Sequence, residues 1–210
     1  MRATGCILRT FLALGAWRAC AAASAADLEL LTHDASGAVV ADAVVYATPT
    51  VPMFAAAGTH AVIDQVNRRF VPRVSVLQTG TAVQFPNSDN IRHSVYSFSQ
   101  PKVFTLKLYS GQPASPVIFD KPGVVVLGCN IHDKMVAWLL IIDTPFFAHT
   151  DQTGSATLKG LPAGDYVVRA WNVPMTQEQD GQAVHIGAAA PARVTLQVEA
   201  AKADVAALTP

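Results

Sequence analysis

The chain has 210 residues, which is enough for one large domain or two small domains with substantial cores. Only 14% of its residues are charged, and its 15 basic and 15 acidic residues cancel. A chain without a basic stripe is not expected to bind nucleic acid. No segment is long and apolar enough to predict a membrane-spanning helix.

The first 25 residues are typical of a cleaved secretory signal peptide. Arg2 and Arg9 precede the apolar segment 10–17, and the small residues at 23 and 25 fit the cleavage rule of signal peptidase. We therefore predict a signal peptide over residues 1–25 and a mature protein in the periplasm. Without its three arginines, the remaining chain has 12 basic and 15 acidic residues and a net charge near −3.

Two alternatives to cleavage remain open for the N-terminus. Arg18 interrupts the apolar region, so an uncleaved anchor is one alternative, although the apolar run is too short to cross a bilayer. Cys20 lies in the sequence WRAC, which is a poor lipoprotein acylation signal. Cleavage is the favoured interpretation.

The cysteine count gives the first indication of a metal. Cys6 and Cys20 lie in the predicted signal peptide, which leaves Cys129 as a single cysteine that cannot form an internal disulfide. In an oxidising compartment an exposed thiol is oxidised or cross-linked. The Cys129 thiol is therefore expected to be either buried or bound to a metal ion.

The rest of the chain has almost no helical periodicity. Short runs rich in β-branched and aromatic residues alternate with Gly, Pro, Asn and Asp, and tight turns are expected at 80–81 and 122–123. This pattern predicts an all-β sandwich or barrel. The predicted strands cover residues 39–47, 71–78, 82–85, 103–109, 124–127, 135–142 and 166–171.

Two separated segments resemble the halves of a second, smaller sandwich. Residues 34–47 indicate strand, turn and strand, and residues 150–172 indicate turn, strand, turn and strand. Both are similar to halves of transthyretin-like or carboxypeptidase-regulatory-like β-sandwiches, here separated by about a hundred residues. Insertion of one domain into another is tolerated because domain termini often lie close together. We therefore predict a flanking sandwich from 27–59 and 146–198, a central domain over 60–143, and a loose tail over 199–210.

The sequence GCNIHDKM contains three candidate metal ligands. Cys129, His132 and Met135 follow a C-x2-H-x2-M pattern directly after the predicted strand 124–127. Thiolate and imidazole suit copper or zinc, and the thioether favours copper, because structural zinc sites use closed Cys and His sets without Met. A trigonal site of two His and one Cys with a weak axial Met requires a second histidine.

His93 is the candidate for that second histidine. It follows a strand and a polar turn and opens an alternating run over 93–98, so its ring can point from a strand end towards the 129–135 loop. The other histidines have no comparable setting and are predicted to be ordinary surface or turn residues: His33, His60, His149 and His185.

Residues 60–143 resemble the cupredoxin family. The stretch RFVPRVSVLQTGTAVQFPNSDNIRHSV is similar to its opening strands and first histidine, and KPGVVVLGCNIHDKM is similar to its closing strand and ligand loop. The loop spacing resembles that of amicyanin, and the whole chain looks most like cupredoxins associated with methylamine utilisation. This resemblance implies a Greek-key β-sandwich with one type 1 copper ion. The implied ligands are His93, Cys129, His132 and Met135.

Two positions depart from the family pattern. Ser94 stands where an Asn often ties the two ligand loops together, and the 130–134 segment lacks the proline that often follows in the loop. Met135 is the least secure ligand, because it also fits a core residue opening the strand 135–142. A metal-free sandwich with a simply buried cysteine is the alternative for the whole set.

The expected function is single-electron transfer rather than catalysis. The resemblance implies that His132 lies near the surface as the electron port and that a redox partner docks transiently, with Ile131, Asp133 and Lys134 beside it. A multicopper oxidase is disfavoured because the sequence has no His-x-His pair. A copper carrier or assembly factor, and a β-sandwich binding module, remain as alternatives.

Overall fold

The computed structural model describes residues 25–52, 59–113, 115–187 and 192–200. These residues form strands and connecting turns without a helix, so the predicted all-β fold class is confirmed. The strands are β1 (Ala25–His33), β2 (Val44–Pro49), β3 (His60–Val62), β4 (Asp64–Val66), β5 (Arg69–Val71), β6 (Val74–Gln78), β7 (Thr81–Gln84), β8 (His93–Ser97), β9 (Phe104–Tyr109), β10 (Val117–Phe119), β11 (Gly123–Gly128), β12 (Val136–Ile142), β13 (Phe147–His149), β14 (Ser155–Pro162), β15 (Gly164–Trp171), β16 (Gln182–Ile186) and β17 (Ala192–Gln197).

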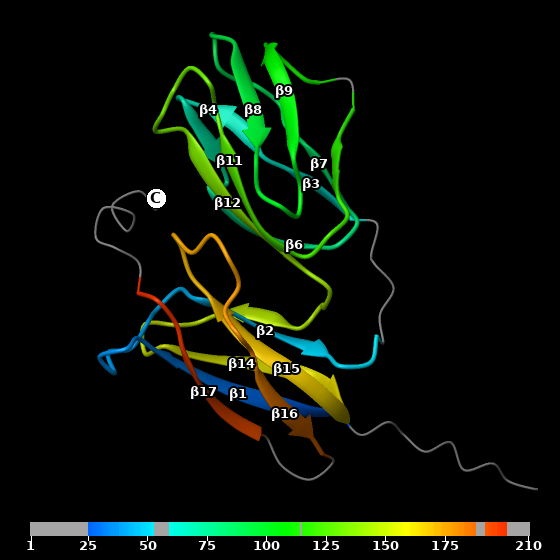
Figure 1. The fold of residues 1–210 in the computed structure, drawn as a ribbon, viewed down its shortest axis with the longest axis vertical. Coiled ribbons are helices and arrows are strands. Elements are labelled where there is room, and N and C mark those ends of the chain that lie inside the picture. The colour runs from blue at the N-terminus through cyan, green and yellow to red at the C-terminus, as the bar shows by residue number, and fades with distance from the viewer. Residues whose placement is uncertain (1–24, 53–58, 114, 188–191, 201–210) are drawn as a thin grey trace, which may run out of the picture.

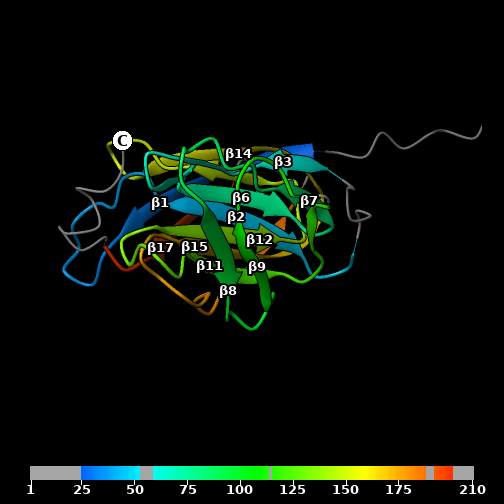
Figure 2. The same ribbon diagram turned by 90° about the horizontal axis from the view of Figure 1, so that it is seen from above.

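The strands group into an upper and a lower half (Figure 1). The upper half contains the five-stranded sheet β6-β12-β11-β8-β9, the three-stranded sheet β10-β7-β3 and the hairpin β4-β5. The lower half contains the four-stranded sheet β13-β2-β15-β16 and the three-stranded sheet β14-β1-β17. In the view from above, β6 and β12 lie over β2 (Figure 2). The five-stranded sheet is therefore the layer that joins the two halves.

Strand β12 contributes side chains to both hydrophobic cores. Trp138, Leu140 and Ile142 pack into the core of the lower half, together with residues of β1, β2, β15 and β17. The alternate residues of the same strand pack into the core of the upper half: Ala137, Leu139 and Ile141. Because side chains alternate between the two faces of a strand, only a nearly continuous apolar run can fill both cores. This explains the sequence VAWLLII.

The upper core lies directly beneath the predicted ligand loop. It contains Phe85, Phe119, Val125 and Leu127, and both Cys129 and Met135 are buried in the same cluster. Strand β8 begins and strand β11 ends in the upper part of Figure 1, away from β2 and β15. The 129–135 loop is therefore anchored by apolar packing at its two ends.

The predicted strands agree with the structure except at residues 34–47 and at 71–78, where a bend at residues 72–73 separates β5 from β6. The pattern indicated a strand starting at Asp34, but β1 ends at His33 and Asp34 begins a turn. The Asp34 carboxylate accepts hydrogen bonds from the N–H groups of Ser36 and Ala38 and from the Ser36 hydroxyl, which hold the pKa of Asp34 below its ordinary value. Such an Asx turn ends a strand because the side chain competes for the backbone donors. The domain boundaries at 59–60 and 143–146 stay a prediction.

Several expectations fall on parts of the chain that the structure does not describe. The predicted signal peptide lies outside the described residues except for Ala25, the first residue of β1. Cys6, Cys20, the 188–191 segment and most of the predicted tail also lie outside them. Within the described ranges, no helix has the length and apolarity needed to span a bilayer.

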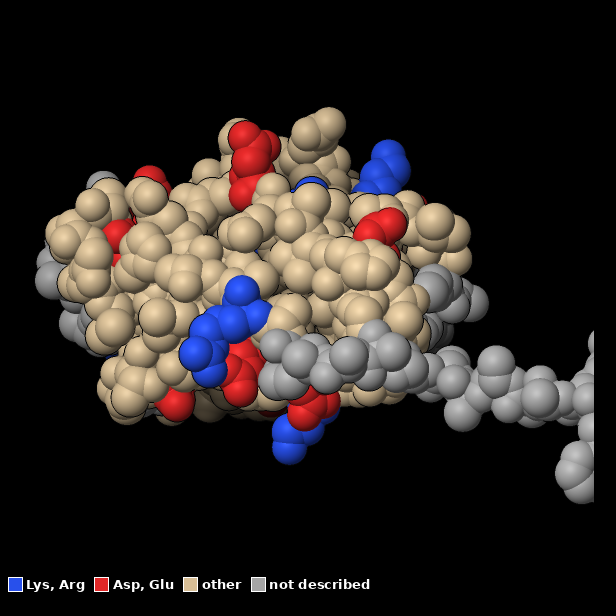
Figure 3. Space-filling model, turned by 90° about the horizontal axis from the view of Figure 1, so that it is seen from below, with Lys and Arg blue, Asp and Glu red and all other residues tan. Residues whose placement is uncertain are grey.

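The lower face of the molecule carries a mixed surface. A few acidic and basic side chains lie in a large uncharged area, some of them next to a side chain of the opposite sign (Figure 3). Arg193 on β17 pairs with Glu29 on β1, which are neighbouring strands of the three-stranded sheet. Since the two signs of charge alternate, this face has the character of a solvated surface rather than a charged binding patch.

Thr150 ties the two sequence segments of the lower half together. Its buried hydroxyl accepts a hydrogen bond from the Ala43 N–H at 3.0 Å and donates one to the Val40 carbonyl at 3.0 Å. We predict that Thr150→Val lowers the free energy of unfolding by about 1–3 kcal/mol, because the buried Ala43 N–H loses its acceptor. The Val40 carbonyl loses one of two donors and keeps the Thr32 hydroxyl. Denaturant unfolding measures this, with the exposed Thr157→Val as the matched control. Equal losses of unfolding free energy in both variants would show that the Thr150 hydrogen bonds do not stabilise the fold.

Candidate metal centre

Three of the four predicted ligands converge on one point. His93 opens β8, Cys129 directly follows β11, and His132 lies in the loop between β11 and β12. One ligand atom from each lies within 4.8 Å of the others, and the Cys129 Sγ is 3.8 Å from the His93 Nδ1. This is the one group of three or more His, Cys, Asp or Glu side chains with such spacing among the described residues.

The antiparallel pairing of β8 with β11 produces this convergence. Gly128, the last residue of β11, pairs with Tyr96 near the end of β8, so the beginning of β8 extends past β11 and lies beside the loop that follows it. A Cβ atom at Gly128 would lie 2.5 Å from the Cζ atom of Tyr96, so the ring of Tyr96 can lie over this position only because it is a glycine. Gly128 therefore contributes to the site by leaving room for the Tyr96 side chain on the paired strand.

His132 carries a buried nitrogen that the protein itself leaves without a partner. Its Nδ1 atom is buried and has no hydrogen bond among the described residues, although the residue as a whole is partly exposed. Its ring lies 5.0 Å from the His93 ring, centroid to centroid. An unpaired buried polar atom costs about 1–3 kcal/mol and calls for an explanation such as a bound ion. The residues therefore fit a metal that accepts a lone pair from His132.

His93 has one ring nitrogen occupied and the other free for a metal. Its Nε2 lies 2.7 Å from the Asp89 Oδ2, and the ring is fully buried. A carboxylate accepts the proton of Nε2, which leaves the Nδ1 lone pair directed at the neighbouring Cys129. Burial alone would raise the pKa of Asp89, but hydrogen bonds from the Arg68 N–H, from His93 and from the Asn67 N–H hold it below its ordinary value.

Ser94 connects the two chain segments that carry the ligands. Its hydroxyl oxygen accepts the Asn130 N–H at 3.0 Å and its O–H lies 3.8 Å from the Cys129 Sγ. Ser94 was identified above as a departure from the family pattern, at a position where Asn often ties the ligand loops. The structure shows that the serine makes such a tie itself.

Met135 ends the loop that carries Cys129 and His132. Its N–H donates to the His132 carbonyl at 2.9 Å, which closes a turn within the ligand loop. The side chain is 1% exposed and packs in the same hydrophobic cluster as Cys129. This burial fits both an axial thioether and a core methionine, so the ligand role of Met135 stays a prediction.

Asn87 fixes the polar loop that precedes His93. Its side-chain amide donates to the carbonyls of Ile91 and Tyr109, and its Oδ1 accepts the Asp89 N–H at 3.1 Å. Tyr109 pairs with His93 across β8 and β9, and burial raises its pKa to about 12. The sequence analysis did not assign roles to Asn87 or Asp89. The signal for both was their place in a polar turn, six and four residues before a histidine at a strand start.

The remaining histidines lie away from the cluster. His149 pairs with Asp42 and His185 with Asp165, and all four of these side chains are at least half exposed. His60 is exposed on β3, and His33 is part-buried with its Nδ1 2.9 Å from the Asp34 carbonyl. Their prediction as surface or turn residues agrees with these positions.

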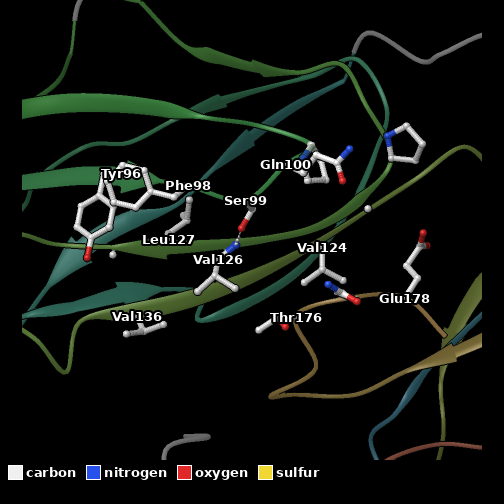
Figure 4. A pocket seen from close by; sticks show the side chains of 15 residues that line it. Tyr96, Phe98, Ser99, Gln100, Val124, Val126, Leu127, Val136, Thr176 and Glu178 are labelled. Carbon is white, nitrogen blue, oxygen red and sulfur yellow. Dashed lines mark hydrogen bonds between the residues drawn. The ribbon is translucent and has the colours of Figure 1, made fainter.

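A cleft of about 780 Å³ lies along β11 (Figure 4). Its lining includes Gly128 and Val136, which flank the ligand loop, and Tyr96, whose ring centroid lies 5.1 Å from that of Phe98. Val124 and Val126 face the cleft, whereas the alternate residues of β11 face the upper core with Cys129. The cleft and the Cys129 thiol therefore lie on opposite faces of β11.

The chain was compared with known proteins. No family model and no curated protein sequence matches it. Solved structures that are similar include the Cu-containing nitrite reductase (NirK) from Thermus scotoductus SA-01, at 24% identity and a TM-score of 0.39 over 46% of this chain and 26% of that chain. A reduced amicyanin mutant has 20% identity and a TM-score of 0.36 over 46% of this chain and 99% of that one. A purple cupredoxin from Nitrosopumilus maritimus has 20% identity and a TM-score of 0.34 over 40% and 99%.

These values describe a distant likeness. All three identities are below 25% and all three TM-scores are below 0.5. The chain also spans about a quarter of the nitrite reductase chain. The likeness does not by itself assign the chain to a family, and the metal centre is characterised by its own geometry.

Loss of the Ser94 hydroxyl is predicted to loosen the ligand loop. Ser94→Ala leaves the Asn130 N–H without its acceptor, so we expect faster hydrogen exchange at Asn130 and a loss of about 1 kcal/mol in the free energy of unfolding. Ser88→Ala is the matched control, because the Ser88 hydroxyl binds Asp64 and neither Asn130 nor Cys129. Unchanged exchange at Asn130 in Ser94→Ala would show that the hydroxyl does not hold the loop.

Proposed function

We propose that this chain is an exported type 1 copper protein that carries single electrons. The observation that supports it most directly is the convergence of His93, Cys129 and His132, with a free Nδ1 on His132 and a free thiol. Two imidazoles and one thiolate with a weak thioether are the donor set of blue-copper centres. Copper held there supplies a one-electron Cu(I)/Cu(II) couple. The cupredoxin resemblance of residues 60–143 supports the same assignment.

The protein's contribution is a ligand set that is fixed before the metal binds. His93 is fully buried and Cys129 is 3% exposed, so water is kept from both. Their positions are set by strand ends and by the Ser94 and Asp89 hydrogen bonds. A rigid ligand set offers both oxidation states the same geometry, so little rearrangement accompanies electron transfer.

The loop residues around His132 form the proposed route for electrons. His132 is partly exposed, and Ile131 beside it is 47% exposed. Asp133 and Lys134 are exposed and offer one charge of each sign. We propose that a redox partner docks on this edge in a small, short-lived interface. Ile131 supplies the apolar contact and the two charged residues influence partner choice.

Copper delivery is the second function compatible with the same ligands. A carrier must release its ion to a recipient, whereas an electron carrier must retain it in both oxidation states. The burial of His93 and Cys129 favours retention. The absence of a His-x-His pair from the sequence argues against a multicopper enzyme.

A visible spectrum of the exported chain loaded with copper tests the proposal. We expect an intense blue or green thiolate-to-copper band and reversible one-electron voltammetry. A colourless Cu(I) protein that passes its ion to a competing chelator would instead support delivery. Failure to bind copper with thiolate character would overturn both functions.

Replacement of the thiol is predicted to remove the spectroscopic signature. Cys129→Ser should abolish the intense band and most of the copper affinity, because the hydroxyl of serine is a far poorer donor for copper than a thiolate. Absorption and copper titration measure both effects. His185→Ala is the control, because this exposed histidine lies outside the cluster. A retained band in Cys129→Ser would exclude Cys129 as the ligand.

Replacement of the thioether is predicted to change the reduction potential while preserving binding. Met135→Leu keeps the side-chain volume, so we expect stability within about 1.5 kcal/mol of wild type and a raised potential. Met175→Leu is the control, because Met175 is buried in the lower core. An unchanged potential in Met135→Leu would make Met135 a core residue, and a lost site would make it more than a weak axial ligand.

A further inference from the structure

One carboxylate connects a predicted ligand to a hairpin that is distant in sequence. The Asp89 Oδ2 accepts hydrogen bonds from the His93 Nε2 at 2.7 Å and from the Arg68 N–H at 2.8 Å. The Asp89 Oδ1 accepts the Asn67 N–H at 2.6 Å. Three donors from two chain segments therefore converge on a side chain that is 11% exposed.

The hairpin turn is shaped to present these two amides. Asn67 and Arg68 are the two residues between β4 and β5, with φ angles of 52° and 60°. Two left-handed residues define a type I′ turn, in which a bulky residue such as arginine is uncommon. The Asp89 carboxylate compensates this conformation by binding both N–H groups.

Asp89 is itself held in place from behind. Its N–H donates to the Asn87 Oδ1, and Asn87 is 5% exposed and bonded to two further carbonyls. The carboxylate is therefore attached to a fixed loop on one side and to a fixed turn on the other. A side chain held in this way can orient a neighbouring ring with little freedom.

We propose that Asp89 is the positioning residue of the metal centre. It holds His93 as the Nε2–H tautomer and directs the Nδ1 lone pair at the space beside the Cys129 Sγ. The β4-β5 turn is then an outer part of the same centre. The copper-dependent part of this inference rests on the proposed function.

The two histidines differ in a way that supports this role. A ring protonated at Nδ1 presents no lone pair to the metal, so the tautomer of His93 decides whether the site is competent. His93 is fixed by a carboxylate and is fully buried, whereas no described residue bonds the Nδ1 of the partly exposed His132. A negative charge bonded to a ligand also increases its basicity and favours the higher oxidation state of a bound metal.

The test compares Asp89→Asn with Asp64→Asn. Asp89→Asn keeps the shape of the side chain but replaces one acceptor oxygen by an NH₂ donor. This NH₂ group then faces donors of the chain, which are the Asn67 N–H, the Arg68 N–H and the His93 Nε2–H. The second removes a carboxylate that serves the same polar loop, since Asp64 binds the Ser88 hydroxyl and the Gln65 N–H and contacts no predicted ligand. The first readout is the His93 tautomer, measured by ¹⁵N NMR in the metal-free protein at about pH 8, which is above the ordinary pKa of imidazole. The second readout is the copper affinity and the reduction potential of the copper-loaded protein.

We expect Asp89→Asn to populate the Nδ1–H tautomer of His93, to lower copper affinity about 10- to 100-fold and to raise the potential, while Asp64→Asn changes none of these. An unchanged tautomer, affinity and potential in Asp89→Asn, or equal changes in both variants, would overturn the positioning role. If the wild-type protein lacks a copper–thiolate band, the proposed function fails. The His93 tautomer of the metal-free protein then decides the role of Asp89. A change of this tautomer in Asp89→Asn but not in Asp64→Asn supports the positioning role, and an unchanged tautomer in Asp89→Asn overturns the role.

Discussion

The pairing of β8 with β11 at Tyr96 and Gly128 is the contact on which the metal centre depends. His93 and Cys129 lie 36 positions apart in the chain, and this pairing places the start of β8 beside the loop that follows β11. A shift of one residue in the pairing would turn one of the two side chains to the opposite face of the sheet. Gly128 leaves room for the Tyr96 ring, which occupies the space where a Cβ would lie.

The rigidity of the site follows from its position between two cores. Strand β12 fills the lower core with one face and the upper core with the other, so the end of the ligand loop is attached to both halves of the molecule. Residues of β1, β2 and β15 pack against one face of the five-stranded sheet, which would otherwise be exposed. His132 stays partly exposed in this arrangement.

The sequence was sufficient for the all-β class, for most strands of the five-stranded sheet and for the three residues that converge, because these are encoded locally. Alternating and continuous apolar runs predict strands, and the C-x2-H-x2-M spacing identifies a ligand loop without any knowledge of its surroundings. The supporting residues could not be predicted in the same way. Asp89 is informative only when its carboxylate is seen between the His93 ring and the turn at Asn67 and Arg68, and this requires the relative position of segments some 20 residues apart. The error at Asp34 has a related cause, since an Asx turn is determined by one side-chain oxygen rather than by hydropathy.

The two histidines of the cluster would meet different requirements of the proposed electron carrier. A buried ligand with a carboxylate partner keeps the metal environment constant, and His93 has both properties. A ligand at the surface brings the metal within reach of another protein, and the partly exposed His132 next to Ile131 has that position. One histidine cannot do both, because the burial that fixes His93 also removes it from any partner. Ser94 on the buried strand β8 accepts the Asn130 N–H and lies 3.8 Å from the Cys129 Sγ. This hydrogen bond limits the motion of the loop that carries Cys129 and His132.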